Sequence, residues 1–280
     1  MDLEADIIEF RVPTENNKTL FIWDIQTTFT EAYIYESLWC VYSAFGPLYL
    51  LKVCPNASVA APGFYALVKF YSAAQASKAQ RTTDKQRLFQ EVPLKVRLST
   101  KQNPSFLSAS QSLSHAKCQD LANHYLGYNG WSTHIITVKD VSQCADAGWS
   151  LGGDSQEELL KYGCVVKLTL PQHGVTCHGV GVAEETVDRD KGPEEKLWMR
   201  GKLMKWAKDK AVVAAFEKLL LIVLGNGKVA VECSIDREEI LPDEDVEGVI
   251  RINDITWSAP AAAAGEEEDL PWNSSMELSH

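Results

Sequence analysis

The chain has 280 residues, of which 45% are hydrophobic, and a formal net charge of −11. This length allows one or two globular domains. There is no apolar run long enough to span a membrane and no charged–apolar–small leader, so we expect a soluble protein that is neither membrane-bound nor secreted. The seven cysteines include no Cys-x-x-Cys pair, which favours reduced thiols in the cytosol or nucleus over disulfides.

The negative charge is concentrated at the C-terminal end. Residues 1–100 hold ten acids and ten bases, residues 101–232 hold fifteen of each, and Cys233–His280 hold thirteen acids and two bases. The part expected to fold is therefore electrically balanced, so the acidic total does not exclude a polyanionic partner. Residues 258–280, with an alanine run and Glu266–Asp269, are expected to form a disordered acidic tail.

Residues 1–17 are expected to be an N-terminal arm, in which Ile7, Ile8 and Phe10 dock on the folded part. The region that follows, residues 18–99, has turn, cap and periodicity signals that predict the order β-α-β-β-α-β. The expected elements are strand Thr19–Ile25, helix Thr30–Ala44, strands Leu48–Val53 and Gly63–Phe70, a Ser72-capped helix to about Thr83, and strand Pro93–Leu98.

Two of these strands carry aromatic residues on the face predicted to point to solvent. Phe64, Ala66, Val68 and Phe70 alternate with Tyr65, Leu67 and Lys69, while Leu20 and Ile22 alternate with Phe21 and Trp23. Aromatic rings beside a cation can stack a base and neutralise its phosphate. The two strands and their order resemble the RNA recognition motif (RRM), which implies a β-α-β-β-α-β sandwich with a four-stranded antiparallel sheet.

Three positions depart from the pattern of that family. Leu67 stands where a second aromatic is common, Gly63 where Lys or Arg is usual, and Asp24 where Asn is usual. The predicted nucleic-acid-binding face consists of Phe21, Trp23, Lys52, Tyr65, Leu67, Lys69, Lys95 and Arg97. The alternative is that this sheet face packs on a partner helix or on the second domain of the same chain.

Residues 100–114 are serine-rich and predict a linker, and residues 115–257 predict a second α+β domain. Its expected elements are a short helix, strands Ile135–Val141, Gly163–Leu170 and Cys177–Ala183, a long helix from about Glu194 to Leu224, and strand Lys228–Cys233. The helix has a predicted apolar stripe of Met199, Leu203, Trp206, Val213, Phe216 and Leu220, with Lys202, Lys205 and Lys208 away from it.

This second region contains Leu121-Ala122-Asn123, then Gly127-Tyr128-Asn129-Gly130-Trp131-Ser132, and Gly179-Val180-Gly181-Val182. These strings resemble the single-strand annealing core of the Rad-fifty-two recombination family. An RRM followed by such a core is similar to the Rad-fifty-two motif-containing family of vertebrates. The resemblance implies a β-β-β-α unit that binds single-stranded DNA, duplex DNA and RNA in recombination or the damage response. It also implies a location in the nucleus, including the nucleolus or nuclear bodies, and the cytoplasm.

The resemblance places Lys117 on the DNA backbone and a basic pair at Glu217 and Lys218, while Leu221 stands at a later basic position. Glu217 would repel phosphate, so the fold is expected to transfer better than the annealing groove. Tyr128, Asn129, Gly130 and Trp131 are expected to form a turn and a core or subunit anchor. Self-association is expected through Trp131 and the apolar helix.

No motif for catalysis is present in the sequence, so we expect a binding protein and not an enzyme, without a cofactor. His173, Cys177 and His178 lack a fourth ligand, so no metal is expected. Gly179-x-Gly181 lacks the third glycine of a phosphate-binding loop, so the two glycines are expected to lie within a strand. Two further functions stay open: a protein-interaction scaffold that uses the sheet and the acidic tail, and a general RNA-processing factor.

Overall fold

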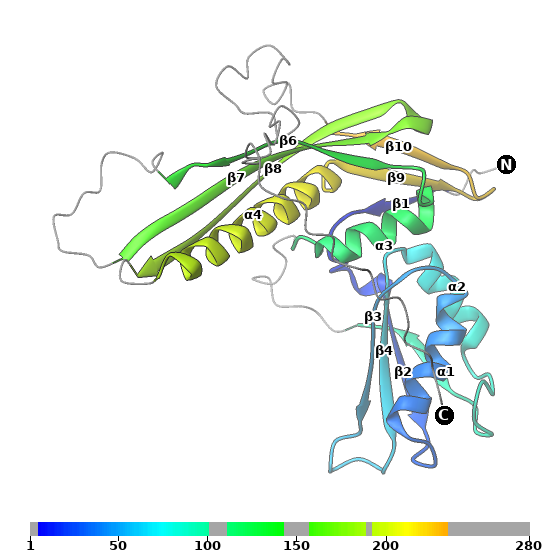
Figure 1. The fold of residues 1–280 in the computed structure, drawn as a ribbon. Coiled ribbons are helices and arrows are strands. Elements are labelled where there is room, and N and C mark those ends of the chain that lie inside the picture. Colours follow the sequence, from blue (N-terminus) through cyan, green and yellow to red (C-terminus); the bar gives the residue numbers. More distant parts are fainter. Residues whose placement is uncertain (1–4, 101–110, 143–156, 189–191, 235–280) are drawn as a thin grey trace, which may run out of the picture.

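The computed structural model describes residues 5–100, 111–142, 157–188 and 192–234. They form an α+β protein with three antiparallel sheets (Figure 1). The predicted tail, residues 258–280, lies outside the described residues, as do residues 101–110 of the predicted linker. No helix of the described part is long and apolar enough to cross a membrane.

The first domain has the RRM topology that the sequence predicts. Its elements are β2 (Thr19–Ile25), α1 (Glu31–Ser43), β3 (Leu48–Pro55), β4 (Phe64–Phe70), α2 (Ala73–Thr83) and β5 (Lys95–Leu98), and the strand order is β3-β4-β2-β5. Each helix begins at a side-chain cap, because Thr30 and Ser72 accept hydrogen bonds from the backbone N–H groups of Tyr33 and Gln75. The inward residues of β2 and β4 are buried under these helices, which leaves the other face of the sheet free.

The second domain contains α3 (His115–Leu126), β6 (Ser132–Asp140), β7 (Glu157–Leu170), β8 (Val175–Asp188) and α4 (Pro193–Phe216). Strands β6, β7 and β8 form one sheet in that order, and α4 runs along it (Figure 1). The predicted β-β-β-α order is confirmed. Gly179 and Gly181 let α4 approach β8 closely, because a Cβ atom at either position would lie under 3.0 Å from the backbone of α4. The glycines are therefore packing residues.

The prediction of a helix as far as Leu224 is wrong. Helix α4 ends at Phe216, and two strands follow it, β9 (Leu219–Leu224) and β10 (Val229–Cys233). A short apolar run such as Leu219–Leu224 has no periodicity that separates a buried strand from a helix, and pairing to neighbouring strands decides. The predicted stripe is also wrong at Trp206, which is 43% exposed. Alanines fill the buried stripe of α4 in its place, at Ala207, Ala211 and Ala215.

The N-terminal arm contributes a strand to the second domain. Strand β1 (Ala5–Glu9) pairs with β9, which gives a small sheet in the order β1-β9-β10. Ile8 and Phe10 are fully buried, and the ring of Phe10 stacks on Phe216 at 4.9 Å, whereas Ile7 is 52% exposed. From β1 in the second domain, the chain thus crosses to the RRM and then returns to the second domain.

Side chains join the two domains directly. Tyr71, which follows β4, is buried in the core of the second domain. The amide of Gln75 on α2 donates to the hydroxyl of Tyr125 on α3 at 3.0 Å, and Ser72 donates to the carboxylate of Asp6 on β1. Contacts of a buried aromatic and two side-chain hydrogen bonds hold the RRM against β1 and α3.

Candidate nucleic-acid interface

The free face of the RRM sheet brings most of the predicted binding residues together. Strand register places one row across all four strands: Lys52 on β3, Leu67 on β4, Phe21 on β2 and Arg97 on β5. The next row contains Cys54 opposite Tyr65, and Trp23 opposite Lys95. Because side chains alternate along a strand, all of these residues share the face that the helices leave free.

Three aromatic rings form the centre of this face, which we call the aromatic platform (Phe21, Trp23 and Tyr65). The Phe21 ring centroid lies 5.5 Å from that of Trp23 and 5.5 Å from that of Tyr65. Phe21 is 36% exposed, and the other two are half-buried. A hydrogen bond with Cys54 raises the pKa of Tyr65, so its phenol stays uncharged near neutral pH. The platform offers a flat surface on which unpaired bases can stack.

Two cations flank the platform on opposite sides. Lys52 on β3 and Arg97 on β5 are both exposed. A third cation, Lys95, is paired instead with Asp24, whose Oδ2 lies 2.8 Å from its Nζ. Phosphate groups can therefore meet full positive charge at Lys52 and Arg97, and reduced charge at Lys95.

Asp24 occupies this position because β2 bulges between Ile22 and Ile25. Its φ of 64° lies in the left-handed region, which Asp tolerates better than most residues. Gln90 holds the bend, because its amide donates to the carbonyl of Asp24 at 2.8 Å and accepts from the backbone N–H of Gln26 at 3.0 Å. Asp24, which stands where the RRM usually has Asn, thus adds a carboxylate to the edge of the binding face.

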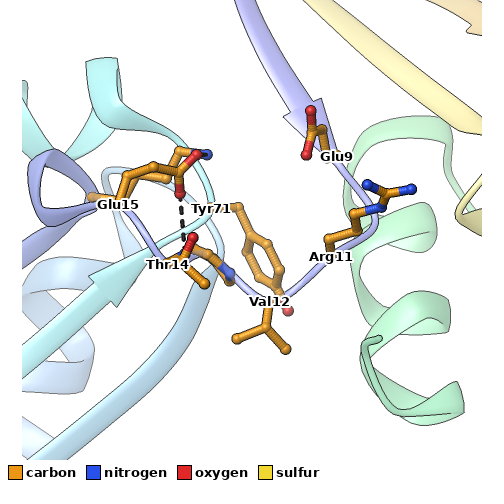
Figure 2. Close-up of a pocket in the computed structure, with 8 residues that line it drawn as sticks. Glu9, Arg11, Val12, Thr14, Glu15 and Tyr71 are labelled. Atoms are coloured by element: carbon orange, nitrogen blue, oxygen red, sulfur yellow. Dashed lines mark hydrogen bonds and ion pairs between the residues drawn. The ribbon is translucent and has the colours of Figure 1, made fainter. Parts of the chain in front are cut away.

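Lys69, another predicted phosphate ligand, is directed away from the platform. Its ammonium donates to the carbonyl of Pro13 at 2.9 Å, in the segment that connects β1 to the RRM. Burial lowers the pKa of Lys69, and the Glu15 carboxylate partly opposes this. Figure 2 shows this connector passing over Tyr71, with Arg11 on the side of α3 and Glu15 on the side of the RRM. The connector therefore covers the end of the sheet face that carries Lys69.

Lys117 and Lys218 are not brought to the platform either. The Lys117 ammonium donates to the carbonyl of Tyr49 at 2.7 Å and lies 5.1 Å from the centre of its ring. This contact joins α3 to β3. The Lys218 ammonium donates to the carbonyl of His178 at 2.7 Å, and Glu217 caps the C-terminus of α4. In this structure both lysines make contacts that hold elements together.

The Tyr128–Trp131 string lies at the turn between α3 and β6. Gly127 has a φ of 76°, and a Cβ at Gly130 would meet the carbonyl of Leu126, so the turn requires glycine at both. The Trp131 indole donates to Asn123 at 2.9 Å, and its ring meets the edge of Phe216 at 5.3 Å. Tyr128 is 84% exposed. Trp131 thus packs within its own domain.

Among the described residues, no three His, Cys, Asp or Glu side chains gather in a way that could hold a metal ion. The Cys177 thiol donates to the carbonyl of Ala215 at 3.5 Å, and burial raises the pKa of Cys177 to about 12. A thiol that stays protonated is a poor metal ligand, so Cys177 serves the packing of β8 on α4.

Several residues at the domain junction could not be predicted from the sequence. Tyr49 on β3 and Tyr71 after β4 meet edge to face at 5.9 Å, and both pack against the core of the second domain, yet the sequence around each resembles that of an ordinary strand. A signal for the arm was the spacing of Ile8 and Phe10, because apolar residues two positions apart indicate a strand. The strand's partner, β9, lies more than two hundred residues away along the chain.

The four-stranded sheet with an aromatic free face, joined to an α-β-β-β-α unit, defines an RRM protein with a second α+β domain. Residues 113–220, which span that unit, match the family model described as RDM1 DSRM domain. The chain is 66% identical to RAD52 motif-containing protein 1 of Danio rerio over 279 residues, 99% of both chains. It is 44% identical to the Gallus gallus protein of that name (90% of this chain, 89% of the relative) and 38% identical to the Homo sapiens protein (95% and 93%). The chain belongs to the RAD52 motif-containing protein 1 family.

A solved structure also resembles part of the chain. It is the solution structure of the N-terminal RNA-binding domain of a hypothetical protein, 29% identical, which covers 34% of this chain and 92% of its own, with a TM-score of 0.27.

Proposed function

We propose that this protein binds single-stranded nucleic acid on the aromatic platform of its RRM. Bases stack on Phe21, Trp23 and Tyr65, while Lys52 and Arg97 meet the phosphates on either side. The observation that carries the proposal is the contiguous set of rings, 5.5 Å apart from centre to centre, between two exposed cations. Stacking contributes roughly 1–3 kcal/mol per base and tolerates any base, so we expect little sequence preference.

The wider role proposed is in DNA recombination, repair or the damage response, as a binding protein and not an enzyme. The name of the relatives, which includes the RAD52 motif, supports this role. Single-stranded DNA, duplex DNA and RNA are the proposed partners, together with a second copy of the chain. The nucleus, including the nucleolus or nuclear bodies, and the cytoplasm are the proposed locations.

Fluorescence anisotropy of the full chain tests the platform against matched single-stranded DNA, duplex DNA and RNA at two salt concentrations. The double variant Phe21→Ala/Tyr65→Ala should lower single-strand affinity at least tenfold, since roughly 1–3 kcal/mol is lost per base. The matched control is Tyr35→Ala/Trp39→Ala on α1, which removes two exposed rings that stack at 6.2 Å on the opposite side of the domain.

Equal binding by the platform variant and wild type would refute the platform. If the wild type binds none of the three polymers at low micromolar concentration, the protein-interaction scaffold becomes the better account of the sheet and tail. A preference for RNA over both DNA forms would favour the general RNA-processing role over recombination.

A further inference from the structure

A second aromatic surface lies on the exposed side of α4. Trp198 and Trp206 are 64% and 43% exposed, although tryptophan is usually highly buried. Lys202 lies between them, with its ammonium 5.4 Å from the Trp198 ring centre and 4.3 Å from that of Trp206. Residues four apart lie one above the other on a helix, so the three side chains form a row, which we call the tryptophan row.

The packing of α4 accounts for the exposure of this row. The helix seats its small residues on Gly179 and Gly181 of β8, because only a small surface allows the backbones to approach this closely. The buried stripe contains Met199, Leu203, Ala207, Ala211 and Ala215. Trp198 and Trp206 lie off this stripe, so burial in the domain does not explain them. The ion pair of Lys202 with Glu185 on β8, at 3.1 Å, fixes the lysine between the two rings.

We propose that the tryptophan row is a second contact site for single-stranded nucleic acid. The inference rests on the proposed function and extends it to a surface outside the RRM. Exposed rings with cations between and beside them are the chemistry by which proteins hold unpaired strands without reading sequence. Trp198 and Trp206 are eight residues apart, which is about 12 Å along the helix axis. That distance corresponds to three or four base steps at the ~3.4 Å repeat of stacked bases.

Charge favours a polyanion over a protein partner on this helix. Helix α4 carries six bases and three acids, whereas residues 101–232 as a whole hold fifteen of each. Lys205 and Lys208 are exposed on the same helix. Within the described part of the chain, the lysines of α4 that form ion pairs are Lys196 and Lys202. An interface between proteins is usually depleted in lysine at its centre, and here Lys202 occupies the centre of the row. Its charge is reduced by the ion pair with Glu185, so the charge that meets phosphate comes from Lys205 and Lys208.

The arrangement of the domains allows one strand to use both sites. In Figure 1, α1 and α2 lie on the side of the RRM strands away from α4, so the sheet face without helices is the one on the side of α4. The contacts of Tyr71, Gln75 and Lys117 hold the domains together. A strand that is bound at the platform and is long enough to reach the tryptophan row therefore gains a second, intramolecular contact, which raises affinity for long strands more than for short ones.

The test uses the full chain, fluorescein-labelled oligo(dT) of about 10 and about 30 nucleotides, and anisotropy at low salt. The variant Trp198→Leu/Trp206→Leu keeps apolar side chains on the helix surface but removes the rings. It should lower affinity for the longer strand roughly tenfold and lower affinity for the shorter strand less. The control is Trp39→Leu, which removes a ring with the same 43% exposure on α1 and should change neither affinity.

The outcomes separate this inference from the proposed function. Unchanged binding by Trp198→Leu/Trp206→Leu, with loss in Phe21→Ala/Tyr65→Ala, overturns the second site and leaves the platform standing. The reverse pattern overturns the platform and supports the second site, while no binding by wild type overturns both. Unchanged oligo(dT) binding with an altered sedimentation coefficient would assign the row to a protein contact and also overturn the inference.

A second measurement on the wild type decides the matter if the variant loses its helical circular dichroism. Ultraviolet cross-linking to oligo(dT), followed by peptide mass spectrometry, should identify a peptide that contains Trp198 or Trp206. Cross-links confined to peptides of the RRM would overturn the second site.

Discussion

The close seating of α4 on β8 can be tested by adding one methyl group at Gly181. A Cβ there would lie under 3.0 Å from the backbone of Ala207 and of Ala211, closer than real Cβ atoms come. Neither neighbour is the flexible end of a side chain, so the helix itself must move away from the sheet. Overpacking a well-packed interface costs typically 1–3 kcal/mol, and we place Gly181→Ala at the upper end, about 3 kcal/mol.

Thermal unfolding followed by far-ultraviolet circular dichroism measures this change. One kcal/mol shifts the midpoint of a domain of this size by about 2–4 °C, so Gly181→Ala should melt about 6–12 °C below wild type. Gly201→Ala on the exposed side of α4 is the matched control, because its Cβ meets nothing within 4 Å. Alanine is the better helix former by about 0.5–1 kcal/mol, so this variant should melt slightly higher than wild type.

Equal melting of Gly181→Ala and wild type would refute the reasoning, because it would show that α4 does not touch β8 at Gly181. The result also bears on nucleic-acid binding, because the packing of α4 on β8 directs Trp198 and Trp206 to solvent. A helix rotated about its axis would bury these tryptophans and expose the alanines.

Three further predictions concern charge and reactivity. Asp24→Asn removes the carboxylate from Lys95 and should raise single-strand affinity a few-fold in anisotropy titrations; weaker binding would mean that Asp24 serves the platform by shape and not by charge. Truncation after Trp257 removes an acidic segment that can compete with nucleic acid and should tighten binding, and unchanged affinity would exclude that competition. Burial raises the pKa of Cys118 to about 12, so the folded protein should alkylate at the exposed Cys40 well before Cys118 at pH 8; equal rates by mass spectrometry would contradict this burial.

The RRM could be predicted from the sequence because its signals are local. Three signals act within a few residues and agree with the fold: the alternation in Gly63–Phe70, the caps at Thr30 and Ser72, and Gly46-Pro47, which follows the end of α1. The positions of the rings follow from the same alternation, since a strand sends every second side chain to one face. The aromatic platform could therefore be predicted as soon as the strands had been predicted.

What lay beyond prediction depends on partners that are distant along the chain. Leu219–Leu224 continues the apolar character of α4, and only pairing with β1 and β10 makes it a strand. The exposure of Trp206 likewise depends on the alanines that face the glycines of β8, because helical spacing alone assigns a large apolar residue to the core. The residue types showed that both segments are apolar, but they did not show which segment of the chain each one packs against.

The contacts of the predicted phosphate-binding lysines also could not be predicted from the sequence, and these contacts affect binding. Lys69, Lys117 and Lys218 each donate to a backbone carbonyl, so three predicted phosphate ligands hold segments of the fold together. The platform then retains Lys52 and Arg97 as exposed cations, while Lys95 is exposed but paired with Asp24. For single strands, log K falls with log[salt] at about −0.7 per phosphate neutralised, so two contacts give a slope near −1.4.

Engagement of α4 adds phosphate contacts at Lys205 and Lys208, both exposed, and four contacts give a slope near −2.8. The slope of log K against log[salt] therefore shows, without any mutation, whether one or both surfaces contact the strand. A steep slope for long oligo(dT) with a shallow slope for short oligo(dT) requires a second cationic surface within reach of the platform. Equal shallow slopes at both lengths would confine binding to the RRM, whatever the tryptophans of α4 do.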